Sequence, residues 1–282
     1  MKKLIMLAAA LLSAGAASVL TAPAASAVPG LSFASASSAL DGTDTKSVSV
    51  PCPAGTVPFG GGFFISGGAG GRVSVTRLQA LPPSNTFAVT ATEVAGPAPA
   101  AWRLHGYAIC GAAPAGLTYV SFTTGTDSSS VKTATATCPA GKQLLGVGAR
   151  LEGDGGQVLL DDVRPSAALT SATAVAYEDE TGYAGNWRLR AFGVCANPVA
   201  NLSLQTADTL PANSVDDAVG VGCPAGTKVH GVGGVITGAT GRAMFGGLYP
   251  AANLSSAVAV ATEQNGGFNG NWYTRVYAIC AS

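Results

Sequence analysis

A motif that occurs three times at nearly constant spacing constrains the fold of this chain most. Cys-Pro-Ala-Gly begins at Cys52, Cys138 and Cys223, with spacings of 86 and 85 residues. A second cysteine recurs with spacings of 85 and 85, at Cys110, Cys195 and Cys280. A fixed period of this length is the signature of tandem structural repeats. We therefore predict a leader at 1–27 and three repeats, at 28–113, 114–198 and 199–282.

Other residues recur at matching offsets inside each repeat. A Trp stands eight residues before the second Cys, and a Glu stands 17 residues before it. Two glycines follow the first Cys by eight and ten residues, as Gly60 and Gly62, Gly146 and Gly148, and Gly231 and Gly233. A glycine pair inside an apolar run predicts a β-bulge or a close approach of two backbones.

Each repeat is predicted to be all-β. In the first repeat, apolar or alternating runs are separated by Gly, Pro, Asn and Asp, at 47–50, 57–65, 73–76, 87–92 and 102–110. Short runs at about ten-residue spacing are typical of sandwiches, barrels and prisms. We expect five or six strands per repeat. The repeats are expected to lie around a pseudo-threefold axis, as in a β-prism, or to form three beads.

The first 27 residues have the pattern of a secretory signal peptide. Lys2 and Lys3 precede an apolar stretch at 4–20, and Ala25-Ser26-Ala27 supplies the small residues of a cleavage site. The alternative, a membrane anchor, requires a longer apolar segment and a stop-transfer pattern. We expect a secreted, extracellular protein that does not insert into a membrane after cleavage.

Six cysteines in an exported chain predict three disulfides, because that compartment is oxidising. Two pairing schemes respect the repeat: bridges between neighbouring repeats, with Cys52 meeting Cys280, or one bridge inside each repeat. We favour the second scheme, which pairs Cys52 with Cys110, Cys138 with Cys195, and Cys223 with Cys280. Each bridge would then close a loop that contributes about 4 kcal/mol in the chain-entropy model. The wide spacing, without a C-x-x-C pair, is not typical of a zinc site.

The repeated Glu and Trp are the candidate binding residues. The pairs are Glu93 and Trp102, Glu178 and Trp187, and Glu263 and Trp272. An aromatic ring beside a carboxylate is suited to a sugar, and the hairpin loops add Tyr183, Asn186, Phe268 and Asn271. The alternative, which we favour, is structural: the Trp packs over the disulfide or in the core, and the Glu caps a strand end or meets an arginine.

Few residues are suited to catalysis or to metal binding. The only histidines, His105 and His230, stand at non-equivalent positions outside any hydrolase or metalloprotease motif. Asp161 and Asp162 lack EF-hand spacing and are interpreted as a solvated turn. The formal net charge is zero and only 11% of residues are charged, whereas nucleic-acid binding requires a basic surface. We expect no enzymatic activity, cofactor, metal or nucleic-acid partner.

The order of Cys-Pro-Ala-Gly, glycine pair, Trp and closing Ala-Ile-Cys resembles secreted repeat proteins of actinobacteria. Ala-Ile-Cys closes the first and third repeats, at 108–110 and 278–280, and the second departs with Gly-Val-Cys at 193–195. The resemblance covers the mature chain and implies export and triplication. It implies nothing about the substrate, because that group has no established activity. In layout, though not in motifs, the chain is also similar to the β-prism of vitelline outer-layer proteins.

We therefore expect a secreted, non-enzymatic β-repeat protein that binds a surface glycan or another extracellular protein. An alternative is a structural or assembly component, recognised through exposed strand edges. A further alternative is a secreted hydrolase that uses carboxylates such as Glu178 and Glu263. The same Glu in every repeat disfavours the hydrolase, because an active site normally breaks the symmetry of a repeat.

Overall fold

The structure is a computed structural model that describes residues 28–69, 71–94 and 96–282. The predicted signal peptide lies outside these residues. The described chain contains 18 β-strands and one short 3-10 turn at Pro82–Ser84. None of its helices is long and apolar enough to cross a membrane. The all-β prediction is confirmed, and each repeat has six strands.

The strands follow the same order in every repeat. Repeat 1 contains β1 (Ser32–Ser37), β2 (Thr45–Pro51), β3 (Val57–Gly67), β4 (Val73–Leu81), β5 (Thr86–Glu93) and β6 (Trp102–Gly111). Repeat 2 contains β7 (Thr118–Thr123), β8 (Val131–Thr137), β9 (Gln143–Glu152), β10 (Val158–Pro165), β11 (Ser171–Glu178) and β12 (Arg188–Ala196). Repeat 3 contains β13 (Ser203–Asp208), β14 (Asp216–Gly222), β15 (Lys228–Thr237), β16 (Ala243–Pro250), β17 (Ser256–Glu263) and β18 (Tyr273–Ala281).

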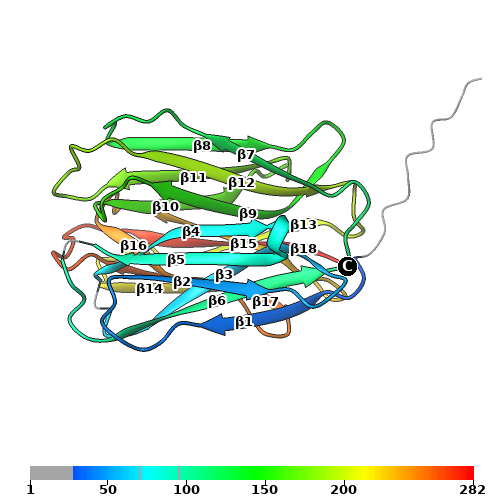
Figure 1. Ribbon diagram of the computed structural model, residues 1–282, viewed down its shortest axis with the longest axis horizontal. Coiled ribbons are helices and arrows are strands. Elements are labelled where there is room, and N and C mark those ends of the chain that lie inside the picture. The colour runs from blue at the N-terminus through cyan, green and yellow to red at the C-terminus, as the bar shows by residue number, and fades with distance from the viewer. Residues whose placement is uncertain (1–27, 70, 95) are drawn as a thin grey trace, which may run out of the picture.

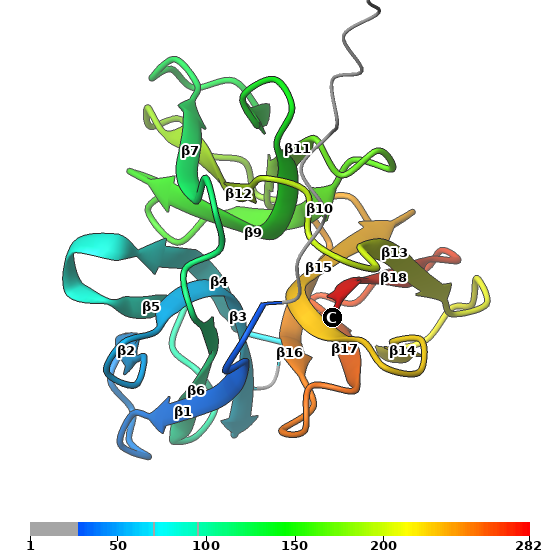
Figure 2. The same ribbon diagram turned by 90° about the vertical axis from the view of Figure 1, so that its right-hand side faces the viewer.

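The strands form three antiparallel sheets of six strands each. Sheet I has the order β1-β6-β3-β16-β17-β14, sheet II the order β2-β5-β4-β9-β12-β7, and sheet III the order β13-β18-β15-β10-β11-β8. Every sheet therefore joins three strands of one repeat to three strands of another. Figure 2 shows the three repeats arranged around a common centre. Of the two arrangements expected from the sequence, the pseudo-threefold one is present, because no repeat completes a sheet by itself.

The strands run side by side along the length of the molecule (Figure 1). At one end, the backbone N–H of Val28 donates to the carbonyl oxygen of Ser282 at 2.9 Å. The N-terminal end of the described chain and its C-terminus therefore meet beside the axis. The loops between the third and fourth strands and between the fifth and sixth strands lie at the opposite end.

The two glycines of each pair allow close approaches between repeats. A Cβ at Gly62 would overlap the carbonyl oxygen of Leu248, in the strand that continues sheet I from repeat 3. A Cβ at Gly60 would lie 2.8 Å from the carbonyl oxygen of His230, close to the pseudo-threefold axis. The register of β3 and β6 also shifts between Pro58 and Gly60. Both the bulge and the close approach predicted from the sequence are confirmed.

Each repeat is a wedge whose two half-sheets enclose apolar side chains. In β2 the side chains alternate, so that Val48 and Val50 are buried while Ser47 and Ser49 are exposed. Such alternation is expected for a strand with one solvated face. One cluster of buried hydrophobic residues includes members of all three repeats. The three wedges therefore share one continuous core.

One disulfide inside each repeat links its two half-sheets. The bridges are Cys52–Cys110, Cys138–Cys195 and Cys223–Cys280, with Cα–Cα distances of 5.7, 5.8 and 5.7 Å. The first cysteine follows the second strand, and the other lies in the sixth strand of the opposite half-sheet. The predicted pairing is confirmed. Three disulfides are also typical of extracellular proteins.

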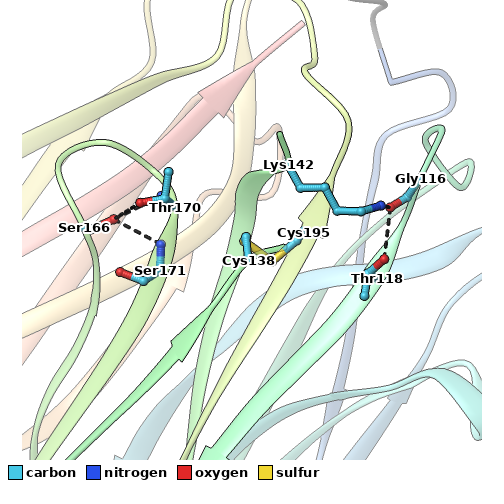
Figure 3. Close-up of a disulfide and its surroundings, with 8 residues drawn as sticks. All are labelled: Gly116, Thr118, Cys138, Lys142, Ser166, Thr170, Ser171 and Cys195. Carbon is cyan, nitrogen blue, oxygen red and sulfur yellow. Dashed lines mark hydrogen bonds between the residues drawn. A yellow bond between two sulfur atoms is a disulfide. The ribbon is translucent and has the colours of Figure 1, made fainter. Parts of the chain in front are cut away.

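Figure 3 shows the surroundings of the disulfide in repeat 2. Beside Cys138 and Cys195, Lys142 donates a hydrogen bond to the carbonyl oxygen of Gly116. The hydroxyl of Thr118 donates to the same oxygen at 3.1 Å. These contacts join the turn after the disulfide to the start of β7.

Candidate functional site

The three predicted Glu–Trp pairs point into the wedges. Trp102 and Trp187 are 0% exposed and Trp272 is 1% exposed. The indole Nε1 of Trp102 donates to Glu93 Oε1 at 2.9 Å, and that of Trp272 donates to Glu263 Oε1 at 3.2 Å. A ring enclosed in this way has no free face on which a sugar can stack.

The second carboxylate oxygen of the Glu closes the hairpin between the fifth and sixth strands. Glu93 Oε2 accepts from the backbone N–H of Ala98 at 2.9 Å, and Glu263 Oε2 accepts from that of Phe268 at 3.0 Å. In repeat 2, among the described residues, Glu178 Oε1 and Trp187 Nε1 are both buried without a hydrogen-bond partner. This geometry favours the structural interpretation of the pairs. Ligand binding by them stays a prediction.

In two of the three repeats a buried lysine, which was not anticipated from the sequence, covers the Trp ring. Lys46 Nζ lies 4.9 Å from the ring centre of Trp102, and Lys132 occupies the same position over the Trp of repeat 2 at 5.0 Å. Lys46 also binds Asp41, which lowers the pKa of that carboxyl to about 2. A lysine at a buried position of an alternating strand was the signal available in the sequence. Asp217 replaces it in repeat 3.

The polar and aromatic residues predicted in the hairpin loops are not brought together into one site. Tyr183 and Phe268 are half-buried at equivalent positions of repeats 2 and 3, and both pack against the core. Asn186 and Asn271 are exposed beside the Trp of their own repeat. Tyr183 and Asn186 therefore lie in the hairpin of repeat 2, and Phe268 and Asn271 lie in the hairpin of repeat 3.

The outer faces of the sheets differ far more between repeats than the interiors do. On sheet I, aromatic side chains from both repeats meet on the solvent side: Phe33, Phe64, Tyr107 and Tyr249, all half-buried. The equivalent of Tyr107 is Phe192 in repeat 2, whereas Phe64 is replaced by Arg150 and Tyr249 by Arg164. We call Phe33, Phe64, Tyr107 and Tyr249 the aromatic face.

The rings of the aromatic face contact one another across the joint between repeats 1 and 3. Phe64 and Tyr249 have ring centres 5.6 Å apart at 70°, and Tyr107 lies 5.9 Å from Tyr249. Phe33 extends the row, 5.5 Å from Tyr107. A Cβ at Gly247 would lie 2.9 Å from Phe64 and 3.1 Å from Tyr249. The glycine therefore leaves room for both rings to lie over β16.

A cavity of about 600 Å³ adjoins the aromatic face toward the loop end of sheet I. Phe64 forms one wall, Val260 and Thr262 belong to the lining, and the polar groups include Asp216 and Gln264. Gly246 also belongs to the lining, and the nearest atom to a Cβ placed there is 3.7 Å away. The cavity thus combines an aromatic ring, aliphatic groups and hydrogen-bonding side chains.

Position 246 contributes no side chain to this cavity. The equivalent residues of the other repeats are Thr76 and Asp161, whose side chains are 8% and 6% exposed. In those repeats a buried side chain stands at the position where repeat 3 has none. A second cavity, of about 760 Å³, lies at the equivalent junction of repeats 1 and 2, but its lining of Asp, Thr, Glu, Gly, Pro and Gln contains no aromatic ring.

Both histidines are held by hydrogen bonds to neighbouring groups. His105 is held between the hydroxyls of Ser37 and Ser66, at 2.8 and 2.9 Å. Burial, and then the charge of Arg103, lowers its pKa. His230 is fully buried, with Nδ1 3.0 Å from the carbonyl oxygen of Lys228, and burial lowers its pKa as well.

The adjacent Asp161 and Asp162 are buried on β10, at 6% and 8% exposure, so their interpretation as a solvated turn is wrong. The register of β10 and β11 shifts between Leu160 and Asp162, so the two residues lie at a bulge within the strand. Burial, and then the charge of Asp162, raises the pKa of Asp161 well above its usual range. Within 28–69, 71–94 and 96–282, no group of three or more His, Cys, Asp or Glu is arranged to hold a metal ion.

Comparison with known proteins adds no relative to this picture. No protein-family model matches the chain, and no curated protein matches it.

Proposed function

We propose that this chain is a secreted, non-enzymatic binding protein that holds a glycan on the aromatic face and in the adjoining cavity of sheet I. The observation that carries the proposal is the absence of a side chain at Gly246, in a cavity that is also lined by the half-buried ring of Phe64. This combination occurs in one of the three repeats, although all three share the same backbone.

The chemistry of the face suits a carbohydrate. Sugars present apolar C–H faces and many hydroxyls, so a site for them needs rings for stacking and a small number of fixed polar groups. Phe64, Tyr107 and Tyr249 supply half-buried rings whose mutual contacts hold them in place. Thr262, Asp216 and Gln264 supply hydroxyl, carboxylate and amide groups around the cavity.

Secretion is part of the proposal. The pattern of residues 1–27 supports it, and so do the three disulfides, which persist in an oxidising compartment. The scarcity of candidate acids and bases on the face supports a binding role over a catalytic one. Asp216 is the only carboxylate that is exposed in the cavity lining.

The test compares a filled cavity with the wild-type cavity. The mature protein is first screened on an array of microbial and eukaryotic glycans, and the best ligand is then titrated by calorimetry. Gly246→Thr should weaken binding, because the hydroxyl and methyl groups would narrow the cavity beside Phe64. Repeat 1 carries Thr76 at the same position, so the backbone accepts this side chain and the thermal midpoint should change little.

Removal of one ring supplies a second arm with a matched control. Tyr107→Ala should weaken binding at least tenfold, whereas Phe192→Ala, at the equivalent position of sheet II, should leave it unchanged. Unchanged affinity of a folded Gly246→Thr variant would refute the site. So would a loss caused equally by both ring deletions, or the absence of any ligand on the array.

A further inference from the structure

Sheet II carries a row of three arginines across neighbouring strands of its outer face. Arg77 in β4 is the register partner of Arg150 in β9, and Arg150 is the register partner of Arg190 in β12. All three are half-buried. Because neighbouring strands lie about 4.8 Å apart, the three guanidinium groups share a band only about 10 Å wide. We call Arg77, Arg150 and Arg190 the arginine row.

The fold does not require this row. The equivalent residues of sheet III are Asp162, Val235 and Arg275, and those of sheet I are Gly247, Phe64 and His105. The backbone is thus formed equally well by neutral or mixed residues. Like charges at directly opposite positions of a sheet are destabilising. Burial, followed by the charge of Arg150, lowers the pKa of Arg77.

The arginines are held in place by contacts through Nε. Arg77 Nε donates to Gln79 Oε1 at 2.9 Å, and Arg190 Nε donates to Thr123 Oγ1 at 2.6 Å. Arg150 Nε lies 3.1 Å from an oxygen of Glu152. These contacts orient the side chains and involve only one carboxylate, which Arg188 also binds. Among the described residues, the ion pairs of the three arginines involve the one carboxylate of Glu152, and Arg188, which binds the same group, adds a fourth positive charge.

Sheet III has an arginine at the position equivalent to Arg190, but this arginine is paired differently. There, Arg275 occupies the position of Arg190 and stacks near Tyr277, 6.0 Å from the ring centre, as Arg190 does over Phe192 at 5.9 Å. Asp208 binds Arg275 through both Nε and Nη2, at the position where sheet II has a threonine. The arginine at this position is thus neutralised by a carboxylate in sheet III, whereas in sheet II its partner is a neutral threonine.

Hydroxyl side chains continue the row to both edges of the sheet. Thr90 is the register partner of Arg77, and Ser47 is the partner of Thr90 at the edge strand β2. Thr123 ends the row on the opposite edge strand, β7. A flat band of cations with hydroxyls at both ends matches a chain that carries anionic groups among many hydroxyls.

We propose that the arginine row binds the sulfate, phosphate or carboxylate groups of an acidic polysaccharide. Guanidinium groups recognise such oxyanions through paired N–H donors. A nucleic acid is the less suitable polyanion, because the whole chain has a formal net charge of zero and the band is short. The row lies on a different sheet from the aromatic face, so this inference does not depend on the glycan site of sheet I.

The test uses a heparin oligosaccharide as the probe, with its desulfated form and duplex DNA as comparisons. Arg77→Gln and Arg190→Gln should each weaken heparin binding on the order of tenfold, and both should reduce its dependence on salt. The matched control is Arg275→Gln, which removes an arginine that Asp208 already neutralises and should change the affinity less than twofold. Gly246→Thr should have no effect, which separates this site from the proposed glycan site.

Stability measurements exclude a merely structural role. Arg77→Gln removes a repulsion, so the thermal midpoint should stay the same or rise while binding falls. Equal losses from Arg190→Gln and Arg275→Gln would overturn the proposal, since they would reflect net charge alone. So would heparin binding that survives desulfation, no heparin binding by the wild-type protein, or tighter binding to duplex DNA than to heparin.

Discussion

Replacement of Trp102 by Ala tests whether the repeated Trp stabilises the wedge. The indole ring is 0% exposed, and its Nε1 donates to Glu93 Oε1. Truncation of a fully buried aromatic side chain costs roughly 3–5 kcal/mol, because a cavity remains. It also leaves the half-buried carboxylate of Glu93 without this donor, which costs about 1 kcal/mol more. We expect Trp102→Ala to lower the free energy of unfolding by at least about 4 kcal/mol.

The hydrogen bond is separated from the packing by replacement with phenylalanine. Trp102→Phe keeps most of the buried ring and removes the N–H, so its cost should be about 1–3 kcal/mol. In repeat 2 the corresponding N–H of Trp187 has no partner among the described residues. Trp187→Phe should therefore cost less than Trp102→Phe.

Urea titration of the oxidised mature protein, followed by circular dichroism, measures these differences. With an m-value of about 3 kcal/mol/M, the Trp102→Ala midpoint should fall by more than about 1 M in a single transition, since the three wedges share a core. An unchanged midpoint would show that the buried ring contributes no stability. Equal costs for the two phenylalanine variants would show that the bond to Glu93 contributes nothing.

Three further perturbations test the axis, the joint and the buried acid. Burial lowers the pKa of His230 in the folded state. The contribution of the buried imidazole to stability is therefore full above pH about 6.5 and is lost as the pH falls below that value. His230→Leu should flatten this part of the curve of urea midpoint against pH. Gly62→Ala should lower the melting temperature by several degrees, because its methyl group would overlap the carbonyl oxygen of Leu248, whereas Gly42→Ala, which meets no atom within 4 Å, should leave it unchanged. Burial raises the pKa of Asp161, so its ionised form is disfavoured in the folded state at neutral pH; Asp161→Thr should raise the midpoint at pH 7, and this gain should shrink on acidification.

The sequence by itself determined the repeat and the strand class, because these depend on local alternation and on a spacing that recurs three times. It reduced the disulfide pairing to two schemes, and the structure shows the favoured one, with a bridge inside each repeat. The glycine pairs also predicted the bulge and the close backbone approach. Their partners, such as Leu248 above Gly62, belong to another repeat and were not predictable, because nothing local specifies which strand continues a sheet.

The direction in which the Glu–Trp pairs point was predictable from the sequence only in part. Alternation placed Trp187 on the same face as Cys195, which favoured burial, and the structure shows that the ring is enclosed. Alternation alone does not decide whether a face is covered, because that depends on the half-sheet packed against it. The interpretation of Asp161 and Asp162 as an exposed turn failed because both residues lie inside a strand, at a bulge that local alternation does not specify.

Only the tertiary structure decided which side chains share an outer face. Phe64 and Tyr249 belong to different repeats, and so do Arg77 and Arg150, yet each pair meets at a joint between repeats. The repeat pattern reports the buried positions, because the same core must be filled three times. The outer positions are free of that constraint and vary from repeat to repeat, and their combination is set by the register of strands far apart in the sequence.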